Sequence, residues 1–296
     1  MTADPQCSVI VPAYAATGFL ARTVTSVLRQ TLTDWELIVV ADDAVDYEDV
    51  LHDQGLADPR VKFVSTGCVG GGAGTARNVG ADAARARVVV TLDCDDVLDE
   101  CALERLVPLA LAHGAAYGDV RMVRDTTGEL MTSLDRRIPT GLVSLETILT
   151  SQIHTYASIA FDRSRVSARW LGGRIGWEDL WFYAACFDDL DAIYHLAQPL
   201  YEYRRREGST TTERGAAEYF LQSATELRSG LESGAPLGLR SERVRETMVR
   251  YLQGREYLEA LYLEQEAAGR YTDFLDFVAD HRDRFYRLDS SSPSLT

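Results

Sequence analysis

The sequence predicts an α/β fold with a mostly parallel sheet covered by helices on both faces, followed by a C-terminal helical region. Two observations support this prediction. Over residues 1–120, short apolar runs of the β type alternate with segments of helical spacing, which is the pattern of a parallel sheet with crossover helices. After about residue 215 only helical spacing remains.

The elements of the first part follow one another in order. The apolar runs are too short to be helices, and the segments between them carry apolar side chains on one side, as helices do. The predicted strands are Ser8–Val11, Trp35–Val40, Val61–Val64, Arg87–Leu92 and Ala115–Val123. The predicted helices are Gly18–Gln30, Ala73–Arg85 and Leu103–His113.

The middle of the chain is less regular, and residues 124–170 contain no motif that we can read. The run WFYAACF that begins at Trp181 continues a helical apolar pattern, so Trp181 and Phe182 are expected in the core. His154 is a candidate acceptor-site residue, with a structural role as the alternative. Helical spacing returns from Val244 to Leu261 and from Tyr271 to Tyr286, after a predicted loop at Gly230–Glu242.

Composition excludes several classes of protein. The 296-residue chain has a formal net charge of -15, so it lacks the basic surface that nucleic-acid binding needs. Its five cysteines include no CxxC pair, so neither a disulfide framework nor a zinc site is expected, and a reducing compartment fits. No basic leader and no long apolar run stand in the sequence. We therefore expect a cytoplasmic protein without a membrane span.

Three of the predicted strands end in segments that could carry chemistry. Because the carboxyl ends of parallel strands meet at one edge of a sheet, where α/β proteins bind ligands, these segments are expected to lie close together. They are Pro12-Ala13-Tyr14, Asp42-Asp43 and the run Asp93-Cys94-Asp95-Asp96.

The last of these segments belongs to VVVTLDCDDVLDE, which crowds five acidic residues behind a buried strand. Two carboxylates about 6 Å apart repel by roughly 3 kcal/mol at an effective dielectric near 20. Asp93 and Asp95 could relieve this repulsion by holding Mg²⁺ or Mn²⁺, which prefer oxygen ligands and often share their shell with phosphates. A solvated turn is the alternative, and for Asp99 and Glu100 a helix-start role is preferred.

Seven motifs in order resemble those of family 2 glycosyltransferases. The resemblance spans about residues 7–212. The motifs are SVIVPAY with SVLRQT and WELIVVAD, then ARNVG before LDCDD, then Trp177-Glu178-Asp179, and last the stretch from Tyr203-Arg204 to Gly208-Ser209. The resemblance implies a GT-A fold, a Rossmann-like three-layer α/β/α arrangement. It also implies an inverting enzyme of the hexosyltransferase type that uses a nucleotide-diphosphate sugar, with a UDP-sugar expected, and Mn²⁺ or Mg²⁺ at its DxD motif.

The resemblance also implies roles for single residues. Asp179 would be the general base that deprotonates the acceptor hydroxyl, with Glu178 beside it, and Asp95 would ligate the metal together with Asp93. Tyr14 would pack on the base of the nucleotide. The other implied donor-site residues are Pro12, Ala13, Asp42 at the base or ribose, Arg77 at the nucleotide, Asp93 near the ribose, Cys94, Trp177 and Arg206.

The chain departs from the family pattern at four places, one of which is the region of about residues 124–170, where no motif can be read. Ala15 stands where asparagine is usual, and Ala41, Asp43 and Ala44 replace the usual acid, glycine and serine around Asp42. These departures leave the base contacts open. Arg206 stands at a histidine position, where an arginine can still neutralise a diphosphate because it keeps its charge at any pH. One of Arg204, Arg205 and Arg206 is expected to meet phosphate.

The resemblance also divides the chain. We expect a catalytic domain at residues 1–214, with the donor half at about 1–97 and the acceptor half at 98–214, and a helical region at 215–296. A homodimer through the C-terminal helices is a hypothesis. It rests on an aromatic face formed by Tyr271, Phe274, Phe277, Val278 and Phe285.

Two other functions remain as alternatives. The first is a non-catalytic module that binds nucleotide sugars. The second is a nicotinamide-dependent oxidoreductase, because Gly72-Ala73-Gly74 precedes Asp93 at nearly the spacing of a dinucleotide fingerprint. The third glycine position of that fingerprint is Arg77, which cannot give the close helix packing that glycine allows.

Overall fold

The computed structural model describes residues 4–131, 137–151, 158–213, 215–235 and 237–285, without the side chain of Phe285. These residues form a nine-stranded mixed sheet in the order β3-β2-β1-β4-β8-β6-β9-β5, with β7 paired to β9. The strands are β1 (Cys7–Ala13), β2 (Trp35–Ala41), β3 (Val61–Ser65), β4 (Val88–Thr91), β5 (Val97–Leu98), β6 (Ala115–Arg124), β7 (Gly141–Val143), β8 (Ala160–Asp162) and β9 (Ile193–Arg205).

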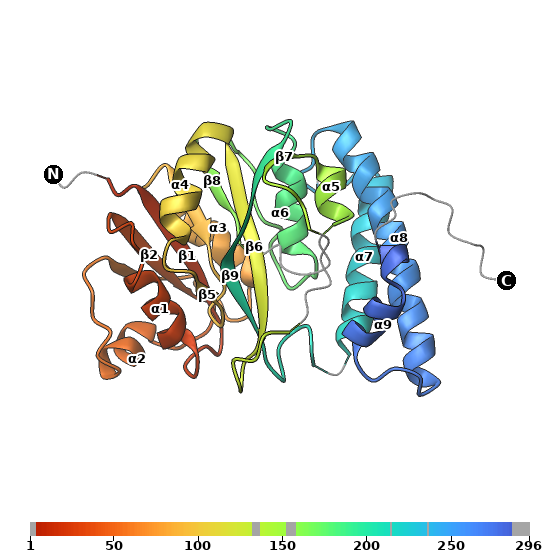
Figure 1. The fold of residues 1–296 in the computed structure, drawn as a ribbon, viewed down its shortest axis with the longest axis horizontal. Coiled ribbons are helices and arrows are strands. Elements are labelled where there is room, and N and C mark those ends of the chain that lie inside the picture. Colours follow the sequence, from red (N-terminus) through yellow and green to blue (C-terminus); the bar gives the residue numbers. More distant parts are fainter. Residues whose placement is uncertain (1–3, 132–136, 152–157, 214, 236, 286–296) are drawn as a thin grey trace.

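The helices of the described residues cover both faces of this sheet and extend beyond it at one end of the molecule (Figure 1). Those of the first half are α1 (Leu20–Leu28), α2 (Tyr47–Asp53), α3 (Ala73–Ala83) and α4 (Ala102–His113). Those of the second half are α5 (Leu145–Leu149), α6 (Glu178–Cys186), α7 (Ala216–Glu232), α8 (Glu242–Ala267), α9 (Phe274–Asp280) and α10 (Arg282–Phe285).

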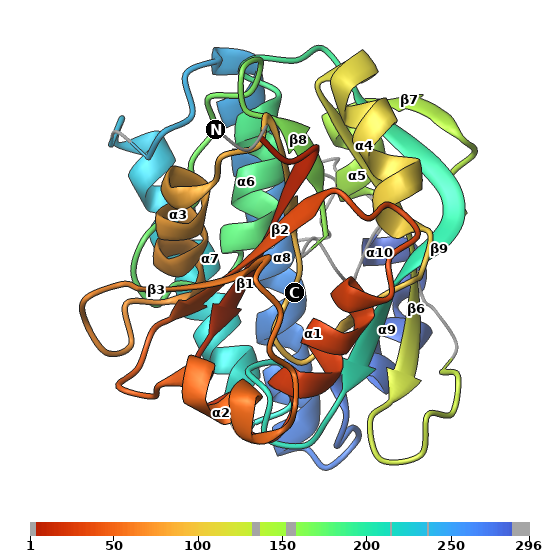
Figure 2. The ribbon, with the colours of Figure 1, turned by 90° about the vertical axis from the view of Figure 1, so that its left-hand side faces the viewer.

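Strand alternation divides the core into two layers. In β1, Ile10 belongs to the cluster that packs against α3 and α6. Its neighbours Val9 and Val11 belong to the cluster that packs against α1 and α4. Figure 2, which looks along the sheet, shows α3 and α6 on one side of the strands and α1 and α4 on the other. The predicted three-layer α/β/α arrangement is therefore confirmed.

The structure adds elements that the sequence prediction lacked. β8 is antiparallel to both β4 and β6, so it separates the parallel strands β3-β2-β1-β4 from the second half of the sheet. The predicted helix around Trp181 and Phe182 is present, and both side chains are fully buried as expected. α2, β5 and the long strand β9 were not predicted.

The C-terminal helices share the core of the sheet. Side chains of α7 and α8, such as Leu227 and Met248, lie in the same buried cluster as Phe182 of α6. The hydrophobic core therefore continues across residue 214. We keep this position only as a proposed boundary between the catalytic domain and the helical region. In the part of the chain that the structure describes, no helix is long and apolar enough to cross a membrane.

Most of the aromatic face on which the homodimer hypothesis rests is used inside the chain. Phe277 and Val278 are completely buried, and Tyr271 and Phe274 pack on the same small cluster, which joins α7, α8 and α9. The side chain of Phe285 lies outside the described part of the structure. The homodimer stays a prediction.

Candidate active site

Three strand ends meet at one edge of the sheet, as predicted. β1 pairs in parallel with β2 and with β4, so that Ala13 lies opposite Ala41 and Ile10 opposite Thr91. This register brings the carboxyl ends of the three strands together. Tyr14 follows β1 with 52% of its surface exposed, whereas the side chains of Pro12 and Ala13 are buried at the strand end.

Asp42 shapes the loop that leads to α3. Its buried carboxylate accepts hydrogen bonds from the Thr66 hydroxyl at 2.8 Å and from the amides of Gly71 and Gly72 at 3.0 and 2.8 Å. A carboxylate that accepts several hydrogen bonds is held firmly in one orientation. Asp42 therefore fixes the glycine-rich loop beside the sheet edge, and a contact of Asp42 with base or ribose stays a prediction.

The glycine-rich loop is closed by protein backbone. A Cβ atom on Gly72 would lie 2.1 Å from the carbonyl oxygen of Gly173, and one on Gly74 would lie 1.9 Å from that of Leu171. Asn78 of α3 adds a pair of hydrogen bonds with the backbone of Trp170, at 2.8 and 3.1 Å. These glycines allow close packing against residues 170–173 rather than the approach of a pyrophosphate, which argues against the oxidoreductase alternative.

Arg77 of α3 joins the two halves of the site. Its side chain is 2% exposed, and its terminal nitrogens lie 2.6 Å from Asp93 Oδ1 and 2.6 Å from Asp179 Oδ1. The carboxylate of Glu178 lies 3.5 Å from the same guanidinium. Asp93 follows β4, whereas Glu178 and Asp179 open α6, about 80 residues later. The motif predicted for the donor site, at Asp93, and the motif predicted to hold the base, at Glu178 and Asp179, therefore both contact one buried arginine.

Three carboxylates around one guanidinium leave an excess of negative charge. Burial raises the pKa of Asp179 well above its ordinary value, Arg77 opposes this, and the charges of Glu178 and Asp93 raise it again. The pKa of Glu178 is also raised, again chiefly by burial. A carboxylate with a raised pKa is a stronger base, which suits the removal of a hydroxyl proton.

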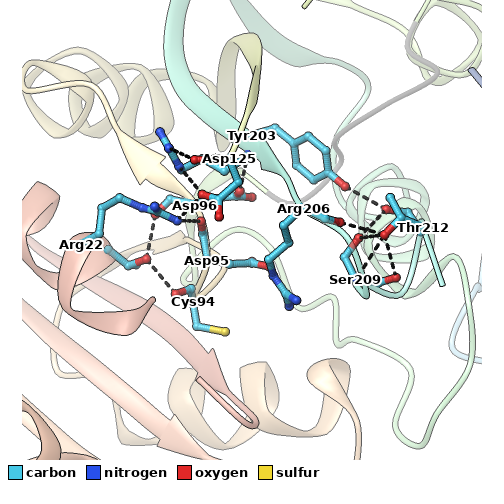
Figure 3. A network of polar contacts seen from close by, with 12 residues as sticks. Arg22, Cys94, Asp95, Asp96, Asp125, Tyr203, Arg206, Ser209 and Thr212 are labelled. Carbon is cyan, nitrogen blue, oxygen red and sulfur yellow. Dashed lines mark hydrogen bonds and ion pairs between the residues drawn. The ribbon is translucent and has the colours of Figure 1, made fainter. Parts of the chain in front are cut away.

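At the acidic strand end, the neighbouring residues Asp95 and Asp96 have different surroundings (Figure 3). Asp95 is partly exposed and forms a 2.9 Å ion pair with Nε of Arg206, whose guanidinium stacks 4.6 Å from the ring of Phe19. Asp96 is buried and accepts hydrogen bonds from the Tyr201 hydroxyl at 2.6 Å and the Arg204 amide at 2.7 Å. Asp95 is therefore available to a ligand, whereas Asp96 holds β9 in place.

The side chain of Asp99 has a local partner, because it accepts a hydrogen bond from the Cys101 amide just before α4. The favourable effect of Asp99 and Glu100 on the start of this helix stays a prediction. The backbone carbonyl of Cys94 accepts a hydrogen bond from the Thr23 hydroxyl. Of the three neighbouring arginines, Arg204 pairs with Asp125 and Glu202, and Arg205 pairs with Asp273. Only Arg206 among them faces the acids of the strand end.

Trp177 stands immediately before the two acids of α6, in a backbone conformation with φ of 71°. Its indole nitrogen donates a hydrogen bond to the carbonyl of Phe220 at 3.1 Å, and its ring packs against Phe220 and Tyr251. The guanidinium of Arg255 lies 4.6 Å from the ring centre. The predicted contact of Trp177 with a sugar stays a prediction, since much of the ring is packed against the C-terminal helices.

Asp93 and Asp95 fit a divalent metal as part of its ligand shell. Their carboxylates are 25% and 22% exposed, they supply oxygen alone, and their mutual repulsion raises the pKa of Asp95 beyond the effect of burial. Among the described residues, no group of three histidine, cysteine, aspartate or glutamate side chains is placed to hold a metal. Further ligands would thus have to come from phosphate oxygens or water, as is usual for Mg²⁺.

Sequence reasoning missed several residues of this site. Tyr201 stands two residues before the motif that begins at Tyr203, but nothing in the sequence indicated that its hydroxyl would meet Asp96. Asp125 lies where no motif could be read, and it pairs with both Arg22 and Arg204. His154 lies outside the described residues. Long-range pairs of this kind leave no local pattern, so only the folded chain reveals them.

Sequence comparisons identify similar proteins. The family profile described as glycosyl transferase family 2 matches residues 8–165. A UDP-Glc:α-D-GlcNAc-diphosphoundecaprenol β-1,3-glucosyltransferase from Escherichia coli is 32% identical over 42% of this chain and 49% of its own length. A poly(ribitol-phosphate) β-N-acetylglucosaminyltransferase from Staphylococcus aureus is 39% identical over 33% of this chain and 31% of its own. The chain thus matches less than half the length of these curated relatives.

Solved structures share the fold. The structure of S. aureus TarS residues 1–349 in complex with UDP-GlcNAc matches with a TM-score of 0.66 and 19% identity, over 85% of this chain and 72% of that one. A mannosyltransferase from Pyrobaculum calidifontis in complex with GDP-Man and Mn²⁺ matches with a TM-score of 0.55 and 15% identity, over 95% and 81%.

Proposed function

The chain belongs to the family 2 glycosyltransferases, and from this membership we propose that it transfers a sugar from a nucleoside diphosphate to an acceptor hydroxyl with inversion at the anomeric carbon. The proposal rests on the two ion pairs that Arg77 forms with Asp93 and with Asp179, at 2.6 Å each. They support the proposal because Asp179, the proposed base, and Asp93, a proposed donor-site residue, contact the same guanidinium, and a single displacement requires base and donor to lie close together.

Asp179 acts as the general base in this proposal. As the acceptor oxygen attacks the anomeric carbon, its proton passes to the carboxylate of Asp179, and the bond from that carbon to the diphosphate breaks with its electron pair on the leaving group. Asp179 lies nearer to Arg77 than Glu178 does, at 2.6 Å against 3.5 Å. Arg77 therefore orients Asp179 more tightly, and Glu178 adds negative charge that favours proton uptake.

The leaving diphosphate lies at the acidic strand end. Arg206 neutralises Asp95 there and is only partly buried, with 28% of its side chain exposed, so its guanidinium can turn to the developing charge on the phosphate. Asp95 and Asp93 would hold a divalent metal together with diphosphate oxygens. When bound, such a metal supplies positive charge that stabilises the departing nucleoside diphosphate.

We propose UDP as the nucleotide and Mn²⁺ or Mg²⁺ as the metal. A fold neighbour is described in complex with UDP-GlcNAc, and a curated relative is named for transfer from UDP-Glc. Another fold neighbour is described with GDP-Man and Mn²⁺, so the family fold accommodates more than one nucleotide. The acceptor is a hydroxyl compound that we do not specify, and we place the reaction in the cytoplasm.

A thermal-shift panel of UDP, GDP, CDP and dTDP, with and without Mn²⁺, tests this proposal. One nucleotide, UDP, is expected to raise the melting temperature clearly, and to do so only with Mn²⁺. A response to NAD instead would favour the oxidoreductase, and no response to any of the four would contradict the donor site. UDP binding without any release of UDP from UDP-GlcNAc or UDP-Glc would favour the non-catalytic module.

The raised pKa of Asp179 predicts the direction of the pH dependence. The base works only when ionised, so turnover is expected to fall as the pH is lowered through that pKa and to level off above it. UDP release from UDP-GlcNAc, measured across pH in the presence of Mn²⁺, shows the profile. The acid limb should be absent from the residual activity of Asp179→Asn, and a limb that stays unchanged there would assign it to another group.

A further inference from the structure

The turn that carries the predicted base is held from outside the catalytic sheet. Trp177 has a left-handed backbone conformation that side-chain-bearing residues adopt only when their surroundings enforce it. Two hydrogen bonds to α7 provide part of that support. The Ser223 hydroxyl accepts one from the Gly176 amide at 3.0 Å, and the Phe220 carbonyl accepts one from the Trp177 indole at 3.1 Å.

α8 supports the same turn with a buried ion pair. Arg255 is 5% exposed and Glu259, one helical turn later, is 1% exposed, and their side chains meet at 2.6 Å. The guanidinium of Arg255 lies 4.6 Å from the ring of Trp177, a distance at which a cation is attracted to an aromatic face. Glu259 thus fixes Arg255 against the ring of Trp177, the residue that precedes Glu178 and Asp179.

The C-terminal helices also contact the strand that leads to the proposed donor site. Arg255 lies 5.9 Å from the ring of Phe274, the first residue of α9. Asp273, which caps α9, forms a 2.6 Å ion pair with Arg205, the last residue of β9 and the neighbour of Arg206. The C-terminal helices therefore connect the base turn to the strand that presents Arg206 to Asp95.

A purely stabilising role explains these contacts less well. A buried ion pair often contributes little to stability, because removing its charges from water costs as much as their attraction returns. Burial raises the pKa of Glu259, with Arg255 opposing this, which shows the cost of placing the carboxyl there. The ion pair does fix the guanidinium of Arg255 in one position against the ring of Trp177.

We propose that Arg255 and Glu259 are positioning residues, which hold Trp177 in its left-handed conformation and thereby set Asp179 against the donor. This inference rests on the proposed function, because it takes Asp179 to be the base. It assigns the helical region after residue 214 a part in the reaction, through the turn that carries Asp179.

The test compares two double variants. Arg255→Met with Glu259→Met removes the pair at similar volume and leaves no buried charge behind. Arg228→Met with Glu256→Met removes a 2.7 Å ion pair that joins α7 to α8, and serves as the control. Two measurements are made on each, namely amide hydrogen exchange of residues 173–187 and the kinetics of UDP release from UDP-GlcNAc with Mn²⁺.

Loss of the Arg255–Glu259 pair is expected to speed exchange in the base turn at least about tenfold and to lower kcat by about 10- to 100-fold, since small misplacements of a catalytic group cost that much. The donor KM should stay within about twofold, and the control should match wild type in both measurements. Arg255→Lys, which keeps the charge but not the planar group on the ring, should fall in between.

Several outcomes of this test would overturn the proposal. Unchanged exchange in a folded Arg255→Met/Glu259→Met variant would overturn the proposal, and so would faster exchange with unchanged kcat. If this double variant does not fold, Arg255→Lys decides alone, and wild-type exchange and kcat there would overturn the proposal. Failure of the proposed function is recognised separately, because Asp179→Asn would then turn over UDP-GlcNAc as fast as wild type whatever the exchange shows.

Discussion

Asp179→Asn is expected to lower turnover of UDP-GlcNAc about a thousandfold and to leave UDP affinity within about twofold. General base catalysis typically contributes about 10²- to 10⁴-fold, and an amide cannot accept the acceptor proton. The substitution keeps the shape of the side chain beside Arg77, which retains Asp93 at 2.6 Å. UDP release measures the rate, and titration calorimetry with UDP and Mn²⁺ measures the affinity.

The same variant should be more stable than wild type. The folded-state pKa of Asp179 is raised, so the folded protein keeps a proton that the unfolded chain has already lost, and stability falls as the pH rises through this window. Above this raised pKa the ionised carboxylate therefore destabilises the fold, and asparagine removes that cost. A higher melting temperature with lost activity is the expected combination.

Glu178→Gln provides the matched control for the base. Its carboxylate lies 3.5 Å from Arg77 rather than 2.6 Å, on the neighbouring residue of the same helix. It should reduce turnover much less than Asp179→Asn. The assignment of the base would be wrong if Glu178→Gln were the inactive variant and Asp179→Asn kept wild-type turnover.

Asp95→Asn is expected to lower turnover at least about a hundredfold and to abolish the Mn²⁺-dependent part of the UDP thermal shift. An amide oxygen is a poorer ligand for a hard divalent cation than a carboxylate, and the variant also loses the charge that positions Arg206 at 2.9 Å. Thermal shift with UDP at increasing Mn²⁺ concentration, together with UDP release, measures both effects.

Asp99→Asn is the control within the same acidic run. The side chain of Asp99 accepts a local hydrogen bond from the Cys101 amide at 3.2 Å, which asparagine can accept equally. It should behave as wild type in both measurements. An Asp95→Asn variant that keeps the full Mn²⁺-dependent shift would remove Asp95 from the metal site.

The sequence was most informative where local pattern and chemistry coincide. The alternation of strands and helices predicted β1 to β4 and the helices α1, α3 and α4 within a few residues, because buried parallel strands read as continuous apolar runs. The strand-end rule then predicted that Tyr14, Asp42 and Asp93 would lie at one edge, which the pairing of β1 with β2 and β4 confirms. The resemblance supplied the functional roles, which pattern alone does not contain.

What escaped prediction depends on tertiary contacts. β9 mixes buried and exposed residues without regular alternation, and its pairing with β6 shifts register opposite Asp119, so it has no period to read. Arg255 and Glu259 look like an ordinary surface pair one helical turn apart, yet both are buried. Asp42 was expected at the nucleotide, and its hydrogen bonds to the glycine-rich loop could be seen only in the folded chain.

The anomeric configuration of the first product tests the central claim most directly. Proton NMR can follow hydrolysis of α-linked UDP-GlcNAc by the wild-type protein with Mn²⁺, before the released sugar mutarotates, with Asp179→Asn as the blank. A single displacement assisted by Asp179 on the face opposite the diphosphate predicts β-GlcNAc as the first product, and little release by the variant. Release of α-GlcNAc, or equal release by Asp179→Asn, would contradict it.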